Sequence, residues 1–164
     1  MLGEDLVDRI ARERRQQQET EELQQRVALE QWAAVKENAG ALWNALADRV
    51  RFLAEKYNQL LRDPFTFSLS DDGLTPHLEV RHEVFPVVVL SVVQESPHLM
   101  TFRIERTEAS FAPTKGTHGR VQVTADTSRN LLMTVQSPNE ERRLHRAEDL
   151  AEYLLEPVFR STRI

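Results

Sequence analysis

The spacing of apolar residues changes near Pro64, the first proline of the chain. Before it, apolar side chains recur mostly every three or four residues from Leu23 to Leu60. This spacing places apolar side chains on one face of a helix, and the segment is rich in good helix formers. Residues 26–62 are therefore predicted to form a long helix that packs along one face.

Gly40 raises the question whether this helix is continuous. Glycine in a helix interior costs about 1 kcal/mol relative to alanine, and Asn38 lies two residues before it. Gly40 and Asn38 accordingly predict either a bend in one long helix or a break into a pair of helices.

Residues 1–25 have a different pattern. Nothing between Arg12 and Glu22 is apolar, so this stretch has no side chain to bury. Leu2, Leu6 and Ile10 form a short apolar stripe of their own. We expect residues 1–25 to form an exposed helical or flexible arm whose stripe contacts a partner.

After Pro64 the apolar period falls from about 3.6 to 2, which indicates β-strands. Five or six such strands lie between residues 65 and 136, and they are joined by short links rich in Asp, Asn, Gly and Pro. Short links favour an antiparallel meander, because a parallel crossover needs a dozen or more residues. Residues 147–156 are predicted to form a short helix that Pro157 ends or kinks.

Together these elements predict an α+β fold. A long N-terminal helix or helix pair covers one face of a five- to six-stranded antiparallel meander sheet, followed by a short C-terminal helix. Residues 26–164 are expected to form a single domain. The uncovered face of the sheet is expected to be polar.

Composition removes several classes of function. The chain of 164 residues has 21 basic and 26 acidic side chains, and this acidic balance argues against nucleic acid as a partner. The absence of cysteine excludes thiol nucleophiles and thiolate metal sites. No apolar run is long enough to cross a membrane, and the start of the chain lacks the pattern of a signal peptide, so we expect a cytoplasmic protein without a membrane partner. Arginine supplies all but three of the basic residues, which suggests a GC-rich, bacterial coding sequence.

One group of candidate ligand-binding residues lies on the polar sheet face. His77 and Glu79 share one side of a strand, Arg103 lies on the same face, and His98 would adjoin them if the strands pair. Imidazole and carboxylate together suit divalent metals or acid–base chemistry. We favour the alternative of a solvated face with cross-strand ion pairs, and we expect no metal site and no cofactor.

A second group of candidates is the loop that contains Lys115 and His118, which combines a cation, an imidazole and two glycines as in an anion cradle. It is not a phosphate-binding P-loop, because Ala112 stands where that motif requires glycine. We favour an ordinary hairpin loop. Sequence motifs of the common hydrolases, zinc proteases and dinucleotide-binding enzymes are also absent.

Two classes of function remain. We favour a non-catalytic interaction or assembly protein whose N-terminal helix mediates self-association or binds a protein partner. The alternative is a small-ligand-binding domain or enzyme, with its site between helix and sheet or on the polar sheet face.

The arm predicts how two copies would pair. A basic block precedes Gln17 and an acidic block follows it, so an antiparallel arrangement about this residue places opposite charges together in a two-fold homodimer. The candidate interface residues are Leu2, Leu6, Ile10, Arg12, Arg15, Glu19, Glu22 and Val27.

Overall fold

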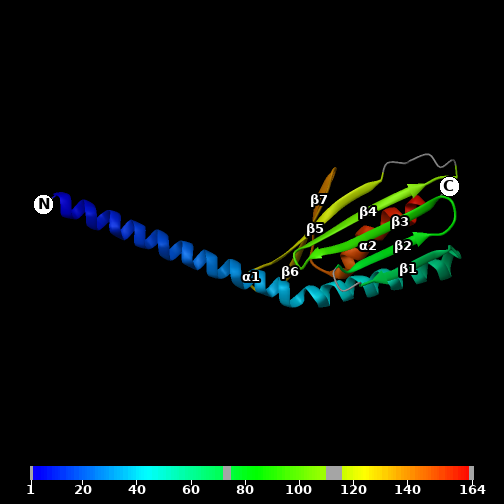
Figure 1. Cartoon of the computed structure of the whole chain (residues 1–164), viewed down its shortest axis with the longest axis horizontal. Coiled ribbons are helices and arrows are strands. Elements are labelled where there is room, and N and C mark those ends of the chain that lie inside the picture. The colour runs from blue at the N-terminus through cyan, green and yellow to red at the C-terminus, as the bar shows by residue number, and fades with distance from the viewer. Residues whose placement is uncertain (1, 72–74, 110–115, 163–164) are drawn as a thin grey trace.

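A computed structural model describes residues 2–71, 75–109 and 116–162 and shows an α+β fold of two helices and seven strands (Figure 1). Helix α1 (Leu2–Leu61) opens the chain and helix α2 (Ala147–Ser161) follows the last strand. The strands are β1 (Phe65–Ser70), β2 (His77–His82), β3 (Val87–Ser96), β4 (Leu99–Thr107), β5 (Thr117–Ala125), β6 (Leu131–Ser137) and β7 (Glu140–Leu144).

The seven strands form one sheet in their order along the chain, and every neighbouring pair is antiparallel. The predicted antiparallel meander is therefore confirmed. Its links use the expected turn chemistry: the Asp126 carboxylate accepts hydrogen bonds from the backbone N–H groups of Ser128 and Asn130, at 2.8 and 2.9 Å.

The prediction of five to six strands was wrong, because β7 was missed. Its sequence is four charged residues followed by Leu144, so it lacks the alternation of apolar and polar residues that reveals a strand. The strand forms because it pairs with β6 at the edge of the sheet. Charged residues are common on edge strands, where they discourage pairing with another sheet.

The two helices cover one face of the sheet. Side chains from the middle and C-terminal end of α1, from α2 and from the inward-facing positions of β1 to β6 form a single apolar cluster. Leu46, Leu90, Met133 and Leu150 are fully buried in it. Burying such a side chain contributes about 1.5–3 kcal/mol, so this layer between helices and sheet holds the fold together.

Helix α1 is continuous through Gly40, so the alternative of a helix pair is excluded. A methyl group at Gly40 would meet no atom within 4 Å apart from its chain neighbours and the adjacent helix backbone, which shows that no close packing requires glycine there. The helix has 60 residues and is about 90 Å long. Its first buried side chain among the described residues is that of Ala34.

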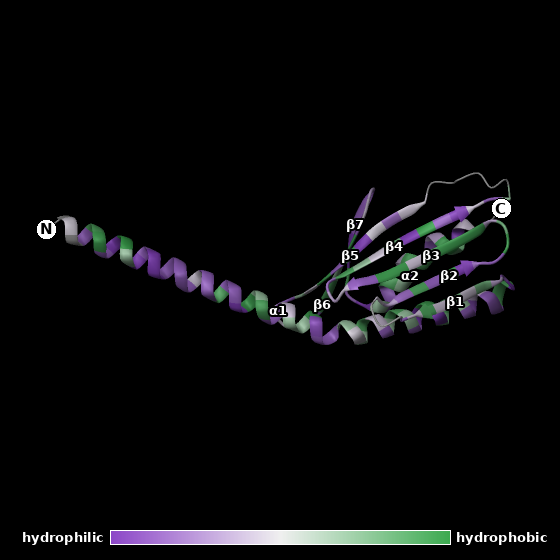
Figure 2. Cartoon of the chain, viewed as in Figure 1, coloured by the Kyte–Doolittle hydropathy of each residue, from purple (hydrophilic) through white to green (hydrophobic). Residues whose placement is uncertain are grey.

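We call residues 2–33 the projecting segment. Figure 1 shows this blue part of α1 extending away from the sheet, and Figure 2 shows mostly hydrophilic residues along it.

Helix α2 is longer than predicted and continues through Pro157 to Ser161. Proline removes one backbone hydrogen bond, but packing holds the last turn in helical form. Val158 is fully buried, and the ring of Phe159 stacks on that of Tyr57 with centroids 4.1 Å apart.

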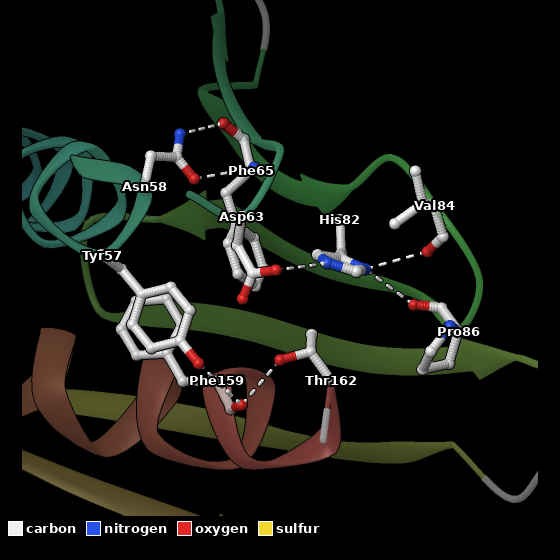
Figure 3. Close-up of polar contacts among 9 residues, drawn as sticks. All are labelled: Tyr57, Asn58, Asp63, Phe65, His82, Val84, Pro86, Phe159 and Thr162. Atoms are coloured by element: carbon white, nitrogen blue, oxygen red, sulfur yellow. Dashed lines mark hydrogen bonds and ion pairs between the residues drawn. The ribbon is translucent and has the colours of Figure 1, made fainter. Parts of the chain in front are cut away.

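Polar contacts join the end of α1 to the first two strands (Figure 3). The Asn58 amide donates to the carbonyl of Phe65 at 2.6 Å and accepts from the N–H of the same residue at 2.8 Å. Arg62 has a φ of 54°, and this left-handed conformation ends the helix.

His82 is a buried polar residue of β2, with 3% of its surface exposed. Its Nδ1 lies 2.9 Å from the carbonyl oxygens of both Val84 and Pro86, and its Nε2 lies 3.5 Å from Asp63 Oδ1 (Figure 3). Carbonyl oxygens only accept hydrogen bonds, so Nδ1 carries the hydrogen. The ring thereby holds the loop before β3, which contains a cis peptide bond ahead of Pro86.

Candidate interaction surface and ligand pocket

The projecting segment exposes apolar side chains that no other part of the described chain covers. Leu6 is 45% exposed and Ile10 is 42% exposed, and Leu23, Val27 and Leu29 are exposed too. Apart from the half-buried Ala11 and Gln31, every described side chain before Ala34 is exposed. A helical stretch whose apolar side chains stay exposed, as they do here up to Leu29, is typical of a segment that pairs with another helix.

The candidate interface residues predicted from the sequence all lie on the projecting segment. Leu6, Ile10 and Val27 are exposed, as are the four charged candidates Arg12, Arg15, Glu19 and Glu22. The side chain of Leu2 lies outside the described part of the chain.

A groove of about 200 Å³ lies where the projecting segment reaches the sheet. Trp32 and Val35 of α1 line one side of it, and His98 and Val123 line the other. The rings of Trp32 and His98 are stacked with centroids 4.8 Å apart, yet Trp32 remains 52% exposed. The Nε2 atom of His98 is buried and has no hydrogen-bond partner among the described residues.

A larger cavity of about 380 Å³ lies between α2 and the strands β4 to β7. Phe102, Ile104, Leu154 and Pro157 give it apolar walls, and polar groups line the rest. Its volume lies within the range of sites that bind small molecules.

Tyr153 and Glu140 lie side by side in the lining of this cavity. The Tyr153 hydroxyl lies 3.3 Å from Glu140 Oε2, close enough to donate a hydrogen bond. Burial, followed by the negative charge of Glu140, raises the pKa of the Tyr153 hydroxyl above its usual value. Arg142 contacts both residues: its Nε lies 3.8 Å from Glu140 Oε1, and its guanidinium lies 5.7 Å from the Tyr153 ring centroid.

The ligand candidates on the uncovered sheet face are only partly brought together. Arg103 and His118 are directly opposite each other in β4 and β5. Glu79 and Arg103 lie in one row across the sheet, but Ser91 of β3 lies between them. His77 is on the same face of β2 as Glu79, whereas His98 lies in the turn after β3 and stacks on Trp32 on the helix-covered side.

The ion pairs on this face differ from those expected. They run along strands, from Arg81 to Glu79 at 3.1 Å and from Arg103 to Glu105 at 3.4 Å, and not across them. The reason is the strand order, since β3 separates β2 from β4. Such exposed pairs contribute only about 0–1 kcal/mol each.

Lys115 lies outside the described residues, so the proposed anion cradle is described only from Gly116 onward. Within the described ranges, no group of three or more His, Asp or Glu side chains is arranged to hold a metal ion. Nor does either described helix have an apolar stretch long enough to cross a membrane.

Several residues of these surfaces were missed from the sequence. Glu140 and Arg142 belong to β7, the strand that gave no alternating pattern, and Tyr153 has the spacing of an ordinary helix residue. His98 was considered only with His77, although the nearby Trp32 lies 66 residues before it in the chain. Contacts between such distant positions leave no local sequence signal.

Comparisons with protein families, with curated proteins and with solved structures found no match to this chain.

Proposed function

We propose that this chain is a non-catalytic interaction or assembly protein that acts through the projecting segment of α1, by self-association or by binding a protein partner. One observation carries the proposal: about half of the helix extends from the fold with Leu6, Ile10, Leu23 and Val27 exposed.

Physical chemistry supports this function, because an isolated helix is only marginally stable in water. Most helical stability in proteins comes from packing of an apolar face, and within the described chain the projecting segment packs only at its C-terminal end, where Trp32 stacks on His98. A second helix laid along Leu6, Ile10 and Val27 would supply it.

Sedimentation velocity over a range of concentrations tests the proposal. We expect the full chain to self-associate, and we expect a variant that lacks residues 2–25 to be monomeric and folded. For a partner other than itself, hydrogen exchange of residues 3–27 in a cell extract provides the second measurement. A chain that stays monomeric and gains no exchange protection in the extract would refute the proposed function.

The cavity beside Tyr153 favours a second candidate function, binding of a small molecule between α2 and the sheet. Its apolar walls and the hydroxyl, carboxylate and guanidinium groups beside them match the usual composition of such sites. A thermal-shift screen with metabolites tests it, because a ligand at 100 times its Kd stabilises a protein by about 2.7 kcal/mol. A true ligand would give no shift with a variant whose cavity is filled, such as Thr117→Trp.

A further inference from the structure

We propose that two copies of this chain pair through their projecting segments in one antiparallel register, and that the first turns of each copy dock in the groove beside Trp32 of the other. This inference rests on the proposed function and specifies its partner as a second copy. Three steps support it: the faces of the projecting segment, the charges beside those faces, and the position of the groove.

In a pair of supercoiled helices, every seventh residue returns to the contact face. Leu6 and Val27 therefore lie in one row, together with Glu13 and Thr20. Ile10 begins the adjacent row, which continues through Gln17, Gln24 and Gln31. An antiparallel pair places residues of one row opposite residues of the other.

One register brings two of the exposed apolar residues, Ile10 and Val27, opposite each other. When Ile10 lies opposite Val27 of the second copy, Gln17 lies opposite Thr20, and Leu6 lies opposite Gln31. The apolar contacts are then at the ends of the pair, and the middle is polar. Polar residues at the centre of such a contact fix register at some cost in stability.

The flanking charges select this register. It brings Arg9 beside Glu30 and Arg14 beside Glu21 of the second copy, and the two-fold axis repeats both contacts. A parallel pair would instead place Arg9 beside Arg14 and Glu13 beside Glu13. The other charged candidates lie away from the contact face and touch no residue of the second copy: Arg12, Arg15, Glu19 and Glu22. Their charges act over a longer range and favour antiparallel approach of the two helices.

Slipping the helices by seven residues is unfavourable in both directions. One slip places Arg14 beside Arg14 of the second copy, and the other places Glu21 beside Glu21. Like charges at such positions oppose pairing, so both of these neighbouring registers are less stable than the proposed one.

The groove lies where the end of the second helix arrives. Leu6 of one copy lies opposite Gln31 of the other, and Gln31 lines the groove together with Ala28, Trp32 and Val35. A volume of about 200 Å³ has room for a leucine side chain. The ring of Trp32 is exposed, and the Nε2 of His98 has no hydrogen-bond partner among the residues that the structure describes. Both features indicate that the surface of a single copy is incomplete at this point.

Disulfide trapping in the full chain tests the register, since the natural sequence contains no cysteine. Two cysteines can join only when their Cα atoms lie within about 7 Å. We expect a mixture of the Ile10→Cys and Val27→Cys variants to give covalent mixed dimers in a redox buffer. The Ile10→Cys variant alone should stay unlinked, because its two copies of residue 10 lie about 25 Å apart along the axis.

Disulfide trapping also tests docking in the groove, and it supplies a matched control. A mixture of Leu6→Cys and Gln31→Cys should also link, which places the first turns at the groove. A mixture of Ile10→Cys and Leu29→Cys should not, because Leu29 is exposed on the opposite face at nearly the same height as Val27.

The outcomes separate this inference from the proposed function. A dimer in sedimentation that links in the two expected mixtures but not in the control supports both. A dimer that links in the control, or in Ile10→Cys alone, overturns the register and leaves self-association standing. A chain that is monomeric at every concentration overturns the inference, and hydrogen exchange in the extract then decides whether the proposed function survives.

Discussion

At the scale of single residues, a few side-chain contacts join one element of the fold to the next. Asn58 is the clearest case, because its side-chain amide bonds both backbone groups of Phe65 and so acts like a short piece of neighbouring strand. The contact fixes the turn that brings β1 back along α1.

We expect Asn58→Ala to lower the free energy of unfolding by about 1–3 kcal/mol, because it leaves the part-buried carbonyl of Phe65 without the Asn58 donor and its N–H with only the Asp63 carbonyl oxygen, at 3.1 Å. Urea unfolding followed by circular dichroism measures the change. Asn44→Ala is the matched control, since Asn44 is exposed on the same helix and its replacement should be neutral or slightly stabilising. Equal effects of the two substitutions would contradict the role of the Phe65 contact.

The raised pKa of Tyr153 leads to a second prediction. In a Tyr57→Phe background, Tyr153 is the one remaining tyrosine of the chain, and its phenolate absorbance should appear above the usual pKa of about 10. Removing the nearby negative charge with Glu140→Gln should bring the midpoint down, though not fully, because burial is the larger cause. No change in the midpoint would show that Glu140 does not influence the hydroxyl.

The raised pKa of Tyr153 also makes the stability of the folded state depend on pH. The folded state holds the tyrosine proton more tightly than the unfolded state, so the contribution to stability is complete below the unfolded pKa. It is lost as the pH rises through the folded pKa.

At the scale of elements, two glycines should respond oppositely to the same substitution. Gly40→Ala should stabilise the protein by about 0.5–1 kcal/mol, because α1 is continuous there and a methyl group meets nothing within 4 Å beyond its chain neighbours and the adjacent helix backbone. Gly119→Ala should destabilise it, since the added Cβ would lie 2.5 Å from Phe102 Cζ and from the carbonyl of Gln136. Thermal unfolding of both variants measures the pair, and stabilisation by Gly119→Ala would contradict the packing of β4 on β5.

At the scale of the whole molecule, the sheet depends on α1 for its cover. A fragment of residues 64–164 should be poorly soluble or molten, because Leu78, Val80 and Val121 would lose the apolar face of α1 that buries them. Dye binding and near-ultraviolet circular dichroism detect this state. As the control, the fragment of residues 26–164 keeps the buried part of α1 and should fold like the full chain. Cooperative unfolding of fragment 64–164 at native-like stability would show that the sheet does not depend on α1.

Self-association also belongs to this scale. We expect Ile10→Asp to weaken the dimer more than raised salt does, because exposed ion pairs supply only about 0–1 kcal/mol each and select orientation more than affinity. Sedimentation equilibrium in low and high salt compares the two effects, with Leu29→Asp as the control on the opposite face. Greater sensitivity to salt than to Ile10→Asp would show that charge, and not apolar contact, holds the copies together.

The amino-acid sequence by itself determined the α+β class, the long N-terminal helix, most of the strands between residues 65 and 136, and the antiparallel meander. These features depend on interactions between residues a few positions apart, such as the helical spacing from Leu23 to Leu60 and the turn chemistry at Asp126. Local patterns record them directly.

Only the tertiary structure decided the charged strand β7, the continuity of α1 at Gly40 and of α2 at Pro157, and the groove and cavity. β7 forms because its backbone pairs with the free side of β6. Pro157 stays helical because the residues after it, Val158 and Phe159, are held by packing. The stacking of Trp32 on His98 and the pairing of Glu140 with Tyr153 join residues from different elements. Such contacts arise when the chain folds back on itself, so no local pattern of residues predicts them.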